Sequence, residues 1–150
     1  MLYCLTVMKW RLIRRRKKRR TTVTKHFVEH KEIARKLIHQ KLIYWNEFYG
    51  FEYKRVAIRN TKRRWGSCTS LKNLNFSYKI LFLPEHLQDY IVVHELCHLQ
   101  ELNHAAGFWQ LVAQQVPNYK KCIAELKVID TAVFKKSLMT STHSSAVSSL

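Results

Sequence analysis

The segment 90–98 places two histidines four residues apart in an otherwise apolar stretch. It reads Tyr-Ile-Val-Val-His-Glu-Leu-Cys-His, and Pro84 precedes it where the first turn of a helix is expected. Residues four apart on a helix differ by only about 40° in direction, so His94 and His98 project from one face. Two imidazoles on one face can bind a single Zn²⁺ ion. This helix must therefore be apolar enough to enter a core and still carry a polar centre.

Glu95 follows the first of these histidines, about 100° further round the helix. From there its carboxylate can reach a water molecule activated by the metal without binding the metal itself. A zinc ion with neutral nitrogen ligands lowers the pKa of bound water from about 15.7 to about 7. H-E-x-x-H strings also occur by chance on buried helices. Burying two histidines and a glutamate without a partner is costly, however, and a metal would provide that partner.

A third ligand is required, and His104 is the best candidate. It follows His98 by six residues, as in the extended motif H-E-x-x-H-x-x-G-x-x-H, although Glu101 replaces the glycine. In an unbroken helix His104 would lie about 15 Å along the axis from His94, so the chain must turn. We place this turn at Asn103, a residue type that tolerates left-handed geometry. The alternative third ligands are Glu101 and Glu125.

The rest of the chain predicts a mixture of helices and strands. Apolar residues at helical spacing predict a helix over 25–48, which Gly50 would end. Alternation of polar and apolar residues predicts strands over 52–59, 63–68 and 73–82. Two further helices are expected over 107–116 and 118–136. These elements indicate an α+β fold with a small sheet.

Composition divides the chain into three parts. Residues 1–20 carry nine of the 27 Lys and Arg residues and no acidic residue, whereas the whole chain has a net charge of +17. We expect a basic N-terminal arm over 1–20 and a single domain over 21–136. The segment 137–150 contains eight Ser and Thr residues and no charged one, so we expect a disordered tail.

The basic arm is the predicted contact for a nucleic acid. Its run of positive charge can bind phosphates, although such runs are often only solvated. The run consists of Arg14, Arg15, Arg16, Lys17, Lys18, Arg19 and Arg20. The apolar stretch before it is shorter than the roughly 20 residues that cross a bilayer. We therefore expect no membrane span and a cytoplasmic protein.

Scattered glycines and cysteines exclude several classes of protein. Gly50, Gly66 and Gly107 lie too far apart to form a dinucleotide-binding loop, a P-loop or a serine-hydrolase elbow. The four cysteines form no C-x-x-C pair, which argues against a zinc ribbon and a disulfide framework. An inverted motif H-x-x-E-H lies at 26–30, but its basic surroundings would repel a cation. We assign it to a helix surface.

Three segments together resemble one family. RNTKRRWGSC at 59–68, PEHLQDYIVVHELCHL at 84–99 and NHAAGFW at 103–109 are similar to the YgjP-like zinc metallopeptidases, which are relatives of the SprT-like proteases. The resemblance covers about residues 30–135. It implies a minimal zincin-like fold, in which a small β-sheet packs against a helix bundle that includes the H-E-x-x-H helix. It also implies that His94, His98 and His104 bind zinc and that Glu95 is the catalytic base.

The segment around Gly66 has two possible roles. A glycine within a strand often marks a bulge or a close approach of the backbone to a ligand. The residues concerned would then line the substrate cleft, since a strand edge usually holds the extended substrate in zincins. A core tryptophan beside a packed glycine explains the pattern equally well. The four candidate residues are Trp65, Gly66, Ser67 and Cys68.

Three functions are consistent with these features. The leading one is a zinc-dependent peptidase that acts on a peptide or protein through metal-activated water and Glu95. The second is a nucleotide pyrophosphatase, an activity attributed to YgjP-like proteins and compatible with a positively charged surface. The third is an SprT-like protease that the basic arm recruits to nucleic acid.

Overall fold

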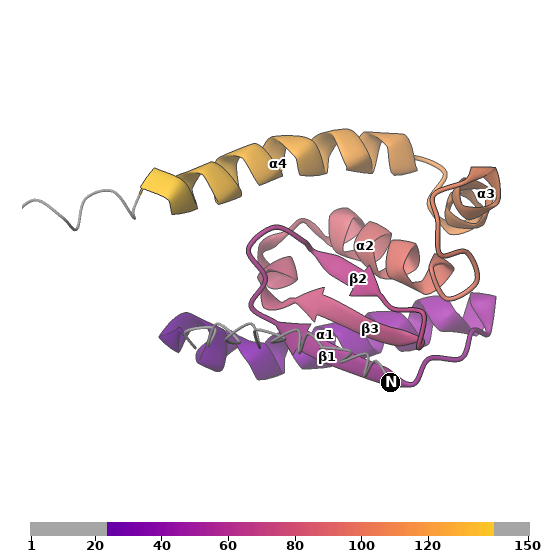
Figure 1. The fold of residues 1–150 in the computed structure, drawn as a ribbon, viewed down its shortest axis with the longest axis horizontal. Coiled ribbons are helices and arrows are strands. Elements are labelled where there is room, and N and C mark those ends of the chain that lie inside the picture. Colours follow the sequence, from indigo (N-terminus) through magenta and orange to yellow (C-terminus); the bar gives the residue numbers. More distant parts are fainter. Residues whose placement is uncertain (1–23, 140–150) are drawn as a thin grey trace, which may run out of the picture.

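The structure is a computed structural model that describes residues 24–139 of the chain, with side chains as far as residue 130. It contains four α-helices, three strands and one 3₁₀ helix within these residues (Figure 1). The predicted basic arm over 1–20 lies outside the described residues, as does the predicted tail beyond Met139. No helix in the described part of the chain is long and apolar enough to cross a membrane.

The three strands form one small mixed sheet. β1 (Arg55–Arg59) pairs in parallel with β3 (Asn73–Ser77), and β2 (Gly66–Cys68) pairs antiparallel with the other side of β3. The order is therefore β1-β3-β2, with β2 at one edge. A three-stranded sheet among helices agrees with the predicted α+β class.

The strands are shorter than the sequence pattern predicts, because each extends only where a neighbour pairs with it. β3 ends at Ser77 rather than at residue 82, and the 3₁₀ helix η1 (Tyr78–Phe82) follows it. The Ser77 hydroxyl caps η1 by accepting a hydrogen bond from the Lys79 backbone N–H. β1 matches β3 residue for residue, so the short central strand also limits its neighbour.

The helices agree closely with the predicted ranges. α1 (Lys25–Tyr49) begins at Thr24, whose side chain accepts from the Phe27 N–H, and ends at Gly50 with a left-handed φ of 64°. α2 (Glu85–Cys97) carries the H-E-x-x-H motif. α3 (Ala106–Gln115) and α4 (Tyr119–Met139) follow it.

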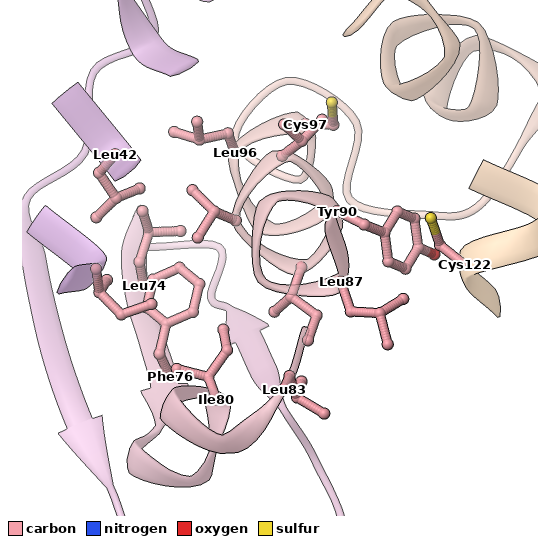
Figure 2. Close-up of a cluster of buried hydrophobic side chains, with 14 of the residues drawn as sticks. Leu42, Leu74, Phe76, Ile80, Leu83, Leu87, Tyr90, Leu96, Cys97 and Cys122 are labelled. Atoms are coloured by element: carbon pink, nitrogen blue, oxygen red, sulfur yellow. The ribbon is translucent and has the colours of Figure 1, made fainter. Parts of the chain in front are cut away.

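α2 is the centre of the core. Figure 2 shows apolar side chains of α1, β3 and η1 around it, with Cys122 of α4 beside Tyr90 on its other side. Nine of the 13 residues of α2 are buried, including Glu95. A helix buried on nearly all sides can carry polar groups only where they find partners.

A polar contact also fixes α2 against α1. The ammonium of Lys41, whose side chain is only 11% exposed, donates to Asp89 at 2.7 Å. The indole N–H of Trp45 donates to the same carboxylate oxygen at 3.0 Å. Because two donors of α1 bind this one half-buried carboxylate of α2, they fix how α2 is rotated about its axis and where it lies along α1. They therefore also fix the position of its last turn.

We predict that shortening a buried side chain of the central strand destabilises the domain much more than shortening an exposed side chain in the turn before it. Leu74 of β3 is fully buried, whereas Leu71 in the preceding turn is 65% exposed. Leu74→Ala should lower the free energy of unfolding by about 2–5 kcal/mol, and Leu71→Ala by less than about 0.5 kcal/mol. Urea denaturation followed by circular dichroism measures both. Equal effects would show that β3 does not lie in the core.

Candidate metal centre

The structure brings three histidines together at the C-terminal end of α2. His94 lies on its last turn and His98 at its C-cap, whereas His104 comes from the loop before α3. The Nε2 atom of His94 lies 3.2 Å from Nε2 of His98 and 3.2 Å from Nε2 of His104. One ligand atom from each of the three residues lies within 4.8 Å of the others, as a shared ion requires.

The turn that brings His104 back begins earlier than we predicted. α2 stops at Cys97, and the Leu99 and Gln100 N–H groups donate to the carbonyl oxygens of Leu96 and Cys97, three residues earlier, in tightened turns. Asn103 has no left-handed backbone, since Lys72 is the only non-glycine described with positive φ. Its side chain acts instead, because Asn103 Oδ1 accepts the N–H of Ala105 at 3.1 Å just before α3.

Aromatic rings of α3 support the histidine cluster. Phe108 is fully buried and stacks on His98 with ring centroids 4.4 Å apart. Trp109 stacks on His104 at 5.5 Å. α3 therefore restricts how both rings can turn, which the sequence spacing alone did not reveal.

A hydrogen bond leaves the facing nitrogen of His98 free to act as a ligand. Nδ1 of His98 lies 2.9 Å from the carbonyl oxygen of Glu101. A carbonyl only accepts, so Nδ1–H is the donor and Nε2 keeps its lone pair. Nδ1 of His94 lies 3.3 Å from the Tyr90 hydroxyl. Burial, reinforced by His98 and His104, lowers the pKa of His94 to about 3, so this ring is neutral at neutral pH.

These donors fit a tetrahedral zinc-like ion. Lone pairs that face each other at 3.2 Å repel unless a proton or a cation lies between them. Two ligands about 2.0–2.1 Å from a tetrahedral centre would lie about 3.3 Å apart, close to the observed separations. Neither alternative third ligand joins the cluster. Glu101 contributes its backbone carbonyl to His98, and Glu125 contacts His86 at 2.6 Å.

Glu95 lies beside this cluster and against the edge strand. It is 5% exposed, and its Oε2 has no hydrogen-bond partner among the described residues. A Cβ atom built on Gly66 of β2 would lie 2.5 Å from Glu95 Oε1. Gly66 is therefore needed because the carboxyl group occupies the space that any side chain would fill.

The histidines and Glu95 share an open cavity of about 250 Å³. It is lined by Arg64, Gly66, Ser67, Cys68, His94, Glu95, His98, Leu102 and His104. Burial raises the pKa of Glu95 to about 8, and the positive charge of Arg64 opposes this rise. Burial and the nearby Glu95 raise the pKa of the Cys68 thiol to about 11, so this thiol is protonated at neutral pH.

Of the four residues predicted to line a cleft, three do so and one does not. Gly66, Ser67 and Cys68 line the cavity. Trp65 lies partly buried against the core, and its indole N–H donates to Asp130 of α4 at 2.7 Å. Arg64 and Leu102 line the cavity without having been predicted. Arg64 immediately precedes the tryptophan of the motif that the sequence analysis singled out.

The inverted motif near the start of α1 forms no comparable cluster. His26 contacts the Tyr78 hydroxyl at 3.1 Å through Nδ1, and Nδ1 of His30 donates to the carbonyl oxygen of His26 at 2.8 Å. The two rings stack with centroids 4.2 Å apart. They are not among the groups of described residues that bring three ligand atoms together.

We predict that Gly66→Ala destabilises the domain by about 1–3 kcal/mol, because β2 or Glu95 must shift to admit the new methyl group. Gly107→Ala is a matched control, since its Cβ would lie 3.7 Å from Glu101 Oε1, an ordinary contact. Urea denaturation of the two variants measures the difference. A Gly66→Ala variant as stable as Gly107→Ala would show that the carboxyl group does not occupy this space.

Comparison with solved structures finds two metallopeptidase zymogens. The metallopeptidase zymogen abylysin of Pyrococcus abyssi superposes with a TM-score of 0.55 and 23% identity, over 61% of this chain and 92% of that chain. The zymogen jannalysin of Methanocaldococcus jannaschii gives 0.49 and 23%, over 67% and 97%. A search of curated proteins gave no match. The likeness to abylysin confirms the predicted small α+β fold.

The family comparison agrees with the resemblance seen in the sequence. The model of the YgjP-like metallopeptidase domain matches residues 10–128, which is most of the chain and includes the histidine cluster, Glu95 and the edge strand. The predicted family and the predicted class of enzyme are thereby confirmed. This chain belongs to the YgjP-like metallopeptidase family, and it is therefore a hydrolase.

Proposed function

We propose that this metallopeptidase is a zinc enzyme that cleaves peptide bonds in a peptide or protein substrate, with Glu95 as its general base. One observation carries the proposal. Three imidazole rings converge next to a buried carboxyl group whose Oε2 has no partner among the described residues, and both groups face the same open cavity. Such a set of groups is typical of H-E-x-x-H metalloproteases.

His94, His98 and His104 would hold the ion through their Nε2 atoms. A zinc ion held there supplies Lewis acidity that acidifies water and polarises a carbonyl group. The chain supplies the rest of the chemistry. Glu95 acts in its carboxylate form, which the positive charge of Arg64 favours and a bound cation would favour further. This carboxylate accepts a proton from the attacking water and returns it to the amine of the leaving group. The Glu101 carbonyl keeps His98 oriented, and the Phe108 ring restricts its rotation.

The edge strand β2 is suited to hold an extended substrate. It pairs with β3 on one side, and Gly66, Ser67 and Cys68 also line the cavity. An extended peptide can add to an exposed strand edge through backbone hydrogen bonds. A peptide bound in this way would pass directly beside Glu95.

We predict that loss of the third ligand and loss of the base have different effects. His104→Ala should lose zinc on dialysis, whereas the wild-type protein retains about one ion per chain. Glu95→Gln should retain the zinc and lose activity by about 10²–10⁴-fold, because the amide cannot accept the proton. Metal analysis and cleavage of fluorescent casein measure the two effects.

His39→Ala is the control for loss of a histidine outside the cluster, and it should resemble the wild type. Zinc occupancy that is unchanged in His104→Ala would contradict the proposed ligand set. Full activity in Glu95→Gln would contradict the proposed base.

We also predict that the substrate is a peptide and not a nucleotide. Zinc-loaded protein should cleave casein and release no pyrophosphate from nucleoside triphosphates, with Glu95→Gln as the blank for both assays. Release of pyrophosphate that depends on Glu95, with casein left intact, would replace the proposed function by a nucleotide pyrophosphatase.

A further inference from the structure

Arg64 is the one side chain lining the active-site cavity that carries a permanent positive charge. We propose that Arg64 is a catalytic residue: its guanidinium group binds the carbonyl oxygen of the scissile bond and the negative charge that develops on that oxygen. The inference rests on the proposed peptidase function and gives a role to Arg64, to which the sequence analysis assigned none.

The backbone at Arg64 is fixed on both sides, just before β2 begins. The Thr61 hydroxyl donates to the carbonyl oxygen of Arg64. At the next residue, the Trp65 carbonyl accepts the Ser77 N–H at 2.7 Å, and the Trp65 indole N–H donates to Asp130 at 2.7 Å. The base of the Arg64 side chain is therefore held by β3 and α4, while the side chain itself is exposed at the cavity.

The guanidinium group is available for a substrate. Arg64 makes no ion pair within the part of the chain that the structure describes, although Lys41 and Arg35 each have an acidic partner there. It also lies close to the reaction centre, because Arg64 and Glu95 line the same cavity and Gly66, two residues after Arg64, lies against the Glu95 carboxyl group. A carbonyl group bound in this cavity beside the carboxylate would therefore be near the guanidinium charge.

Ser67 and Cys68, which also line the cavity, and the nearby Tyr90 are less suited to this role. The Ser67 hydroxyl lies 3.4 Å from Nδ2 of Asn75, on the opposite face of β2 from Gly66, because side chains alternate along a strand. The Cys68 thiol donates to the carbonyl oxygen of its neighbour Thr69, and a thiol is a weak donor. The Tyr90 hydroxyl contacts Nδ1 of His94 and does not line the cavity.

The chemistry of the step favours an arginine. When water adds to a peptide carbonyl, the π electrons move onto the oxygen, and the proton removed from the water goes to Glu95. A guanidinium group has five N–H donors and remains charged at every working pH. Donors that are already in place where the charge develops stabilise the transition state more than the ground state.

Steady-state kinetics of the zinc-loaded full chain on a quenched fluorescent peptide test this role. Arg64→Gln should lower kcat by about 10²–10³-fold and change KM by less than about threefold. Arg64→Lys keeps the charge and should recover at least about tenfold of this loss. The matched control is Arg63→Gln, which removes an adjacent exposed charge that does not line the cavity, and it should leave both constants unchanged.

Binding of a phosphinic peptide gives a second measurement that does not depend on turnover. Its tetrahedral phosphinate carries a negatively charged oxygen where the transition state carries one. Arg64→Gln should bind this analogue at least about 100-fold more weakly by calorimetry, and it should bind the matched uncleaved peptide in the Glu95→Gln background with unchanged affinity. Zinc content and thermal unfolding should equal those of the wild type.

The outcomes separate this inference from the function on which it rests. An unchanged kcat in Arg64→Gln, or a rise in KM alone, would overturn the inference and leave the peptidase intact. A rise in KM alone would instead assign Arg64 to recognition of acidic substrate groups. If the wild-type protein binds zinc and cleaves no peptide, the proposed function itself is wrong and the role of Arg64 falls with it.

Discussion

The last turn of α2 and its C-cap residue carry two imidazoles and a carboxyl group, at the end of a helix that is otherwise buried in apolar side chains. Each buried polar group without a partner there lowers the stability of the fold by about 1–3 kcal/mol. The surrounding elements must therefore provide hydrogen-bond partners for these groups, and a group left without one is expected to have a function. The Glu101 carbonyl satisfies one nitrogen of His98, and Phe108 and Trp109 of α3 enclose the rings. What remains unsatisfied is the set of facing Nε2 atoms and Oε2 of Glu95.

The small sheet completes this arrangement from the other side. β2 contributes a strand edge, a glycine whose missing side chain admits the Glu95 carboxyl group, and the anchored segment that presents Arg64. The Lys41–Asp89 contact holds α2 against α1, and the Trp65–Asp130 hydrogen bond connects the residue just before β2 to α4. Each helix thus fixes one part of the cavity, which explains how a three-stranded sheet is sufficient to build the site.

The family match and the geometry support different parts of the conclusion. The match over residues 10–128 establishes the metallopeptidase family, and the similarity to abylysin establishes the fold. The convergence of the three histidines beside Glu95 supports the proposed ligands and base. The cavity lined by Arg64 goes further, since it points to a group that can stabilise charge on the substrate.

The sequence by itself determined the features that depend on neighbours along the chain. Helical spacing placed His94 and His98 on one face. Thr24 and Gly50 set the two ends of α1 through local capping and backbone geometry. Only the tertiary structure decided what depends on distant partners. Strand pairing ended β3 at Ser77, α2 ended at Cys97 before the chain bent at Leu102 and Asn103, and Gly66 came to face Glu95. Such contacts depend on how separate elements pack, which periodicity along one segment does not encode.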